Sequence, residues 1–234
     1  MDVQCALLSV IIPLAPGEEE WRDLLAQLAQ ALTAGSEVIL VSAGGVMGEV
    51  PEGWPSHLAL HWYTSSRGRA VQMNFGARAA VGKWLWFLHA DSRLQSETID
   101  SLARFIAKGE PALGWFDLAF RSDGPRLTWL NACGANLRAR WLGLPFGDQG
   151  LLLPASTFAA LGGYDERAGR GEDHLLVWAA RHAGLPLRGI GARLATSGRR
   201  YREQGWAATT LQHLRLTATQ AWQGSRSVRR GRAT

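Results

Sequence analysis

The sequence contains little cysteine and almost no lysine. Its two cysteines, Cys5 and Cys133, lie far apart and have neither the pattern of a disulfide framework nor metal-site spacing. We therefore expect a fold held by packing, with free thiols in a reducing compartment. Lys83 and Lys108 are the only lysines among 25 basic residues, so arginine carries the net charge of +5. This charge favours anionic partners such as phosphates or a lipid surface, although a GC-rich genome gives the same composition.

Long apolar runs are also missing. The apolar stretch from Ala6 to Ala15 is too short to span a bilayer and has no basic segment before it. No other window reaches spanning length, so we expect a cytoplasmic protein. The six histidines have no Cys-x-x-Cys partner, and no zinc site is expected. The hydrophobic share of 47% and the charged share of 19% are those of a folded domain, which 234 residues can form.

Short apolar runs alternate with amphipathic segments through the first half of the chain. The runs predict strands at residues 7–13, 37–41, 57–63 and 83–89. The amphipathic segments predict helices at residues 18–32, 70–81 and 96–109. Residues 47–56 contain two prolines and two glycines and are expected to be irregular. The strand, helix, strand order implies right-handed crossovers and a parallel sheet.

The second half has a mixed pattern. It predicts an antiparallel strand at 113–120, a Trp- and Arg-rich helix at 127–142, strands at 150–154 and 185–190, and a helix at 172–183. The expected fold class is therefore α/β, with a mostly parallel central sheet flanked by helices and a mixed second half. We expect one domain over residues 1–223, with a nucleotide-binding half at about 7–110 and an acceptor-side half at 111–223. Residues 224–234 (GSRSVRRGRAT) are expected to form a basic, disordered tail.

The stretch from Arg67 to Asp91 carries the clearest chemical signal. A basic, glycine-containing loop leads into a small-residue helix, then a hydrophobic strand, and Asp91 follows that strand. Ligands of open α/β sheets sit at the carboxyl ends of the strands. An arginine at a helix N-terminus can bind phosphate oxygens, and an aspartate is an oxygen ligand for Mg²⁺ or Mn²⁺. The two would hold a nucleoside diphosphate through a metal, unless Asp91 only stabilises the next helix.

These motifs resemble glycosyltransferase family 2, the inverting enzymes with the GT-A nucleotide-diphospho-sugar fold. Arg67-Gly68 and Asn74-Phe75-Gly76 stand where the family has a basic-Gly element and Asn-x-Gly. His89-Ala90-Asp91 stands where the family has an acidic D-x-D-like triplet. With histidine in its first position, this triplet resembles that of a subgroup of small bacterial glycosyltransferase-like proteins. The resemblance extends from about Leu7 to Tyr201.

The resemblance implies a role for each matching position. Asp91 would hold the divalent metal, Mg²⁺ or Mn²⁺, and Asp173 would be the general base, although Glu172 and Asp173 could also be ordinary acids of a first helical turn. Gly147-Asp148-Gln149 would line the acceptor side, and Thr196 to Tyr201 would form a closing loop. The residues implied for donor and substrate binding are Pro13, Ser42, Arg67, Gly68, Asn74, Ala90, Asp148, Glu172, Arg199, Arg200 and Tyr201.

Two positions depart from the family pattern. Ala15-Pro16-Gly17-Glu18 replaces an Asn-Glu pair, and Ser42 replaces the aspartate that hydrogen-bonds the nucleotide base. An alternative is therefore a catalytically lapsed protein that binds a lipid surface or a partner. A sugar-1-phosphate nucleotidyltransferase is disfavoured, because the loop after the first strand is acidic.

The partners expected are a nucleotide-diphospho-sugar donor and an undetermined acceptor, with a lipid-linked acceptor as one option. Trp129 and Trp141 are interleaved with Arg126, Arg138 and Arg140, which makes a membrane-surface helix an alternative to simple core or interface packing. The protein would then lie at the inner face of the membrane. No nucleic-acid partner is expected, because the basic tail has no accompanying aromatic platform.

Overall fold

The parallel side of the sheet is built by the apolar runs of the first half. The computed structural model describes residues 8–44, 48–169 and 171–211. Strand β1 (Leu8–Leu14) pairs in parallel with β2 (Glu37–Ala43) and with β4 (Trp84–Phe87), and β3 (Ala59–Ser65) adds to β2. All residues of β2 are buried, and β1 is buried except for partial exposure at Pro13. The continuous apolar runs thus form strands that are covered on both faces, as the sequence predicts.

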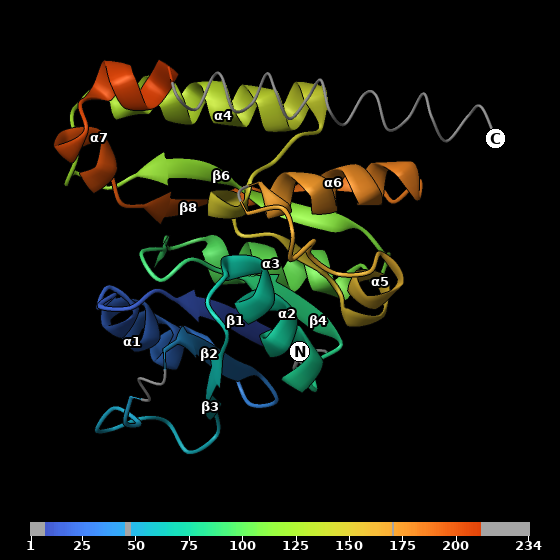
Figure 1. Cartoon of the computed structure of the whole chain (residues 1–234). Coiled ribbons are helices and arrows are strands. Elements are labelled where there is room, and N and C mark those ends of the chain that lie inside the picture. Colours follow the sequence, from blue (N-terminus) through green and yellow to red (C-terminus); the bar gives the residue numbers. More distant parts are fainter. Residues whose placement is uncertain (1–7, 45–47, 170, 212–234) are drawn as a thin grey trace.

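Helices cover both faces of this sheet. Val10 and Ile12 of β1 face a core with α1 (Trp21–Ala31) and α3 (Thr98–Ala107), while Ile11 faces a second core with α2 (Arg69–Ala79) and α6 (Glu172–His182). Alternate side chains of one strand thus reach two cores. Helix α2 packs so closely that a Cβ at Gly76 would lie 2.6 Å from Ile11 Cγ2. Figure 1 shows this layered arrangement.

The second half extends the same sheet. Within the described ranges the sheet has eight strands in the order β3-β2-β1-β4-β7-β6-β8-β5. The added strands are β7 (Leu152–Pro154), β6 (Leu113–Phe120), β8 (Leu187–Thr196) and β5 (Arg93–Leu94). Helix α4 (Thr128–Leu142) packs on β6 at the end of the molecule opposite to β3, and α5 (Ala155–Ala160) follows β7 (Figure 1). The remaining short helices are η1 (Gly147–Gln149) and α7 (Arg199–Glu203).

The predicted orientation of residues 113–120 needs a correction. β6 is antiparallel only to β7 and runs parallel to β8, and β7 is the strand that reverses between β4 and β6. Alternating hydrophobicity reports which side chains are buried and carries no information on strand direction. β8 also continues six residues beyond the predicted end at residue 190. The prediction ends early because Gly191 and the exposed Arg193 interrupt the apolar run, although the buried face of the strand continues past them.

Other boundaries agree with the predictions to within about three residues, as is usual for element ends. The predicted first strand begins one residue before the described part of the chain, and the predicted basic tail at 224–234 lies outside it. Residues 48–56 form turns and irregular structure, as expected. No helix in the described ranges is long and apolar enough to cross a membrane.

Candidate active site

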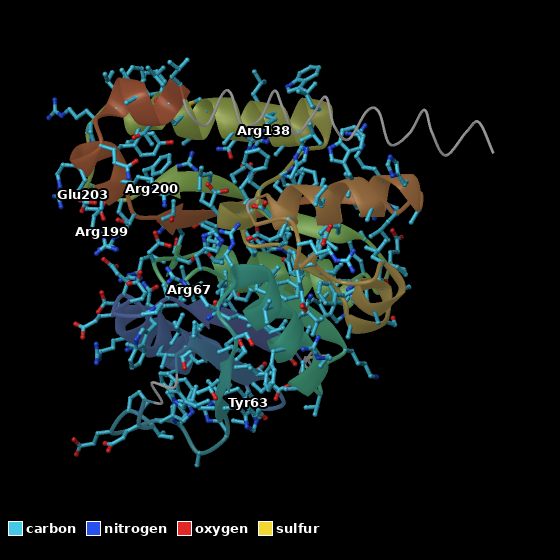
Figure 2. The ribbon with its side chains drawn as sticks, viewed as in Figure 1. Tyr63, Arg67, Arg138, Arg199, Arg200 and Glu203 are labelled. Carbon is cyan, nitrogen blue, oxygen red and sulfur yellow. The ribbon has the colours of Figure 1, made fainter. Side chains whose placement is uncertain are left out.

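A cavity of about 610 Å³ lies where the two halves of the sheet meet. Its walls come from the loop after β4, the start of α2, the start of α6, η1, and the segment from the end of β8 through α7. Arg199, Arg200 and Glu203 lie together around α7 (Figure 2). The lining therefore combines acidic and basic side chains from elements that are far apart in the sequence.

Asp91 ties the loop after β4 to the end of β8. Its Oδ2 accepts a hydrogen bond from Thr196 Oγ1 at 3.0 Å and another from the Ser197 backbone N–H at 3.3 Å. These bonds fix the carboxylate in the cavity wall, as expected for an acid at the end of a buried strand.

Arg69, the first residue of α2, contacts three other side chains at the cavity. Its Nε donates to Glu172, its Nη2 lies 3.6 Å from Asp173 Oδ2, and its Nη1 lies 3.0 Å from His89 Nε2. The acids outweigh burial and raise the pKa of Arg69. A guanidinium has no acceptor, so Nε2 of His89 accepts and the neutral ring carries its proton on Nδ1. Burial and then Arg69 lower the pKa of His89 to about 4, which keeps the ring neutral.

Asp173 is held in place by backbone donors. Its Oδ2 accepts from Gly147 N–H at 2.6 Å, and its Oδ1 accepts from His174 N–H at 2.8 Å. Burial alone would raise the pKa of Asp173, but Arg69 and these N–H groups outweigh burial and lower it. A Cβ at Gly147 would lie 2.9 Å from Asp173 Oδ2, so this position has room only for glycine. Asp173 is therefore an ionised carboxylate in the cavity wall.

Asp148 lies in a contrasting environment in the same cavity. Its Oδ1 is buried and has no hydrogen-bond partner among the described residues. Burial raises the pKa of Asp148 to about 6, and Arg138 offsets this only in part. Arg138 itself stacks 3.6 Å above the Phe146 ring and donates from Nε to the Leu144 carbonyl. A cation in the cavity would therefore stabilise the ionised form of Asp148.

These residues fit a divalent metal that is shared with a bound phosphate. Within residues 8–44, 48–169 and 171–211, no three His, Cys, Asp or Glu side chains lie close enough to hold a metal by themselves. Mg²⁺ is commonly held by one or two carboxylates, with substrate phosphates and waters completing the shell. Asp91 lines the cavity and can supply such a carboxylate. The donor set suits a metal that arrives with a diphosphate.

The structure brings about half of the predicted site residues to this cavity. Asp91, Asp148, Asp173, Arg199, Arg200 and Tyr201 line it, and Glu172 lies behind Arg69. Burial and then Asp148 raise the pKa of Tyr201 to about 12. Its ring packs edge-on against Phe120 at 5.4 Å. Acidic and basic residues of the second half of the chain thus line the same cavity as Asp91, the predicted metal ligand of the first half.

The other predicted residues lie away from the cavity lining. Asn74 exchanges hydrogen bonds with the backbone N–H and C=O of Tyr164 and donates to Glu166, beside a second cavity of about 480 Å³. Arg67 is exposed near the start of α2 (Figure 2), and Gly68 precedes that helix. The Ser42 hydroxyl is buried without a partner in the described residues. Pro13 pairs with Val41 inside the sheet, and Ala90 is buried.

Four important lining or supporting residues were not predicted from the sequence, namely Arg69, His89, Arg138 and Phe146. Arg69 stands two residues after Arg67 in the same basic loop, and the start of α2 decides which of the two points inward. Periodicity places a helix boundary only to within a few residues, so it did not distinguish them. The sequence has no metal-ligand pattern around His89 that would have indicated a role for this residue in the site.

Comparisons with known proteins identify the family and the fold of the chain. The model of the family "Glycosyl transferase family 2" matches residues 9–146. The S. aureus TarS 1–349 structure in complex with UDP-GlcNAc is similar, with 16% identity and a TM-score of 0.62, over 82% of this chain and 58% of TarS. The mannosyltransferase PcManGT from Pyrobaculum calidifontis, in complex with GDP-Man and Mn²⁺, has 18% identity and a TM-score of 0.57, over 80% of this chain and 56% of its own.

Identities this low show a shared fold and nothing more specific. The chain spans a little over half the length of these two solved proteins. No protein with a curated description matches the sequence significantly. The family match covers more than half of the chain, and the structural neighbours are glycosyltransferases of the GT-A fold. The chain therefore belongs to glycosyl transferase family 2 and has its α/β nucleotide-sugar transferase fold.

Proposed function

We propose that this protein is an inverting, metal-assisted glycosyltransferase that moves a sugar from a nucleotide-diphosphate donor to an acceptor hydroxyl. The observation that carries the proposal is the meeting of an ionised Asp173 with the strand-end Asp91 in one cavity. An inverting transfer needs a base on one side of the sugar and charge neutralisation on the other. TarS with UDP-GlcNAc and PcManGT with GDP-Man and Mn²⁺ support the donor class and the metal.

In this mechanism Asp173 accepts the proton of the acceptor hydroxyl as its oxygen attacks the anomeric carbon. The bond from the anomeric carbon to the diphosphate breaks, and the nucleoside diphosphate leaves. General-base help of this kind is worth about 10²–10⁴-fold. Arg199 and Arg200 would bind the departing phosphates, while Asp148 and Tyr201 would contact the acceptor. A divalent metal, Mg²⁺ or Mn²⁺, held by Asp91 would neutralise the negative charge on the leaving group.

The nucleoside end of the donor would lie beyond the cavity lining, toward the ends of β1 and β2. Pro13, Ser42, Gly68 and Ala90 remain predicted contacts there, with Arg67 at the exposed edge. Asn74 supports the site indirectly, by holding the turn at Tyr164 that precedes α6. A cytoplasmic location, a lipid-linked acceptor and contact with a membrane also remain predictions.

A second candidate function is the catalytically lapsed binding protein. The buried, unpartnered hydroxyl of Ser42 favours this alternative, because no carboxylate at that position is available to hydrogen-bond a nucleobase. The retention of Asp91, Asp148 and Asp173 in one cavity favours the enzyme.

A thermal-shift experiment tests the donor site. Wild type and Asp91→Ala are heated with UDP, GDP, CMP or dTDP, each with and without Mn²⁺. Asp100→Ala, which removes an exposed acid of α3, is the matched control. At about one hundred times its dissociation constant, a ligand adds roughly 2.7 kcal/mol, or about 5–10 °C for a domain of this size.

We expect a Mn²⁺-dependent shift with one nucleotide that is lost in Asp91→Ala and kept in the control. Release of nucleotide from the matching sugar donor would then establish transfer chemistry. If no nucleotide shifts the wild type, the lapsed binding protein becomes the better explanation.

A further inference from the structure

Helix α4 exposes its large apolar side chains to solvent and buries small ones, which is the reverse of an ordinary amphipathic helix. The residues that it buries are small: Thr128, Ala132, Ala135 and Ala139. Leu130 and Leu137 face solvent, Trp129 is 60% exposed and Trp141 is 80% exposed. Most helices on a globular protein bury their Leu and Trp residues and expose polar ones. The outer face of α4 is therefore built to meet something apolar.

The charged residues that α4 and its flanking segments contribute to this region are arginines. From Gly124 to Gly147 the sequence contains no aspartate or glutamate. Arg126 is exposed just before α4, and Arg140 is exposed near its end, where it pairs with Asp117 of β6. Arg181 of α6 donates to the Leu142 carbonyl at the end of α4. A partner for this face of α4 would have to offer apolar groups to the tryptophans and negative charge to the arginines beside them.

An anionic lipid surface satisfies both requirements. Tryptophan prefers the boundary between headgroups and acyl chains, leucine enters the acyl region, and arginine binds lipid phosphates. Figure 1 shows α4 at an outer end of the molecule, with residues 206–211 beside it. Trp206 donates to Asn131 of α4 and Asn131 donates to Thr210, while the large apolar side chains of α4 stay exposed. We propose that α4 binds the surface of an anionic membrane through Trp129, Leu130, Leu137 and Trp141.

This orientation also relates the membrane to the cavity. Arg138, on the inner side of α4 (Figure 2), stacks on Phe146, which lines the cavity. The helix therefore separates the lipid surface from the site by its own thickness. An acceptor anchored in that membrane would reach the cavity past the edge of α4, and this consequence alone rests on the proposed function.

The chain offers a site-specific probe on the same face. Cys133 is exposed and lies four residues from both Trp129 and Leu137, so it shares their side of the helix. In the full-length chain with Cys5→Ser, Cys133 is labelled with a polarity-sensitive fluorophore. The labelled protein is mixed with vesicles of phosphatidylcholine alone, or of phosphatidylcholine and phosphatidylglycerol at about three to one, and bound protein is measured by co-sedimentation.

We expect binding to the mixed vesicles, with a blue shift of the label, and weaker binding to neutral vesicles. Leu137→Glu with Trp141→Glu should reduce the partition coefficient by about tenfold or more, since charged groups are costly in the acyl region. Val81→Glu is the matched control, because Val81 is 72% exposed on a different surface. The control should bind vesicles like the wild type.

Three results would overturn the inference. Vesicle binding that persists in the Leu137→Glu, Trp141→Glu variant would assign binding to other basic residues. A label that is already in an apolar environment without vesicles would show that protein covers the face. A dimer in sedimentation velocity that the double variant dissociates would assign the face to a second copy. The nucleotide-dependent thermal shift is measured on the same variants, so failure of the donor site is recognised separately.

Discussion

At the scale of single residues, Arg69 connects the two halves of the site. It comes from the nucleotide-side half, yet it contacts Glu172 and Asp173 of the other half as well as His89. The three nitrogens of one guanidinium point at three different partners, which a lysine ammonium cannot reproduce in the same geometry. Arg69 is therefore expected to position Asp173 and to keep it ionised.

Replacing Arg69 by glutamine should change the pH dependence of transfer. Removal of the cation disfavours the ionised form of Asp173, so its pKa rises and the acidic limb of kcat/KM moves to higher pH. We expect a loss of about tenfold at the acidic end of the profile that becomes smaller as the pH rises. Arg104→Gln, at an exposed arginine of α3, should leave the profile unchanged. A loss of equal size at every pH would contradict the positioning role.

Asp148 gives a second residue-scale prediction, on stability. Its pKa is 3.8 in the reference state and about 6 in the folded protein. Because the folded pKa is raised, the favourable contribution of the protonated form is present below about pH 4 and is lost as the pH rises through about 6. Ionised Asp148 should then cost about 2–3 kcal/mol at neutral pH.

Asp148→Asn should therefore raise the Tm by about 5–10 °C at pH 7.5 and by much less at pH 4. Thermal unfolding at both pH values, without nucleotide or metal, measures the difference. Asp100→Asn on α3 should show no such pH-dependent gain. An equal Tm for wild type and Asp148→Asn at pH 7.5 would mean that the carboxylate is already compensated.

At the scale of elements, buried polar groups lock the first strands together. Ser9 of β1 donates to Glu37 of β2 at 2.5 Å and accepts from the Gly82 N–H at 2.9 Å, while the Val81 N–H donates to Glu37 at 2.7 Å. Glu37 is buried, so its side-chain oxygens need these donors as hydrogen-bond partners. The lock sets the position of the loop that leads from α2 into β4.

Ser9→Ala should destabilise the protein by about 1–3 kcal/mol, because it leaves the Gly82 N–H unpaired and removes a donor from Glu37. Urea unfolding of the variant measures this free energy. Ser66→Ala, at an exposed position, is expected to change stability by less than about 0.5 kcal/mol. A Ser9→Ala protein as stable as that control would show that water replaces the lost hydroxyl.

At the scale of the whole molecule, the sheet is continuous across both halves. β4 of the first half pairs with β7 of the second, and Leu152 lies in the same core as Trp86. The family match ends at residue 146, before β7. In the sheet, however, β7 lies next to β4 and covers its edge. We therefore expect residues 1–223 to behave as one domain rather than as two separable halves.

A fragment of residues 1–146 should consequently fail to fold by itself. Without β7 and α6, the edge of β4 and both cores would be open to water. Circular dichroism in the near and far ultraviolet should show one coincident urea transition for the full chain and no cooperative transition for the fragment. A cooperative transition in the fragment would divide the chain into two domains.

Much of this arrangement was predictable from local patterns. The apolar run at residues 7–13 predicted a buried central strand, and the acid after the fourth strand predicted the wall of a ligand site. The helix at 127–142 was also predicted, but not which of its faces would be buried. Small residues are compatible with many packings, so the outward position of Trp141 depends on the fit of α4 to β6.

By itself, the sequence determined the order and type of most elements and the acidic residues at their ends, because these depend on periodicity and on neighbours in the chain. Only the tertiary structure decided that Arg69 rather than Arg67 enters the cavity, that β7 runs antiparallel to both of its neighbours, and that Oδ1 of Asp148 is buried with no hydrogen-bond partner among the described residues. Each of these features depends on the packing of elements that are up to a hundred residues apart. Such contacts follow from shape and burial in three dimensions, which local patterns do not specify.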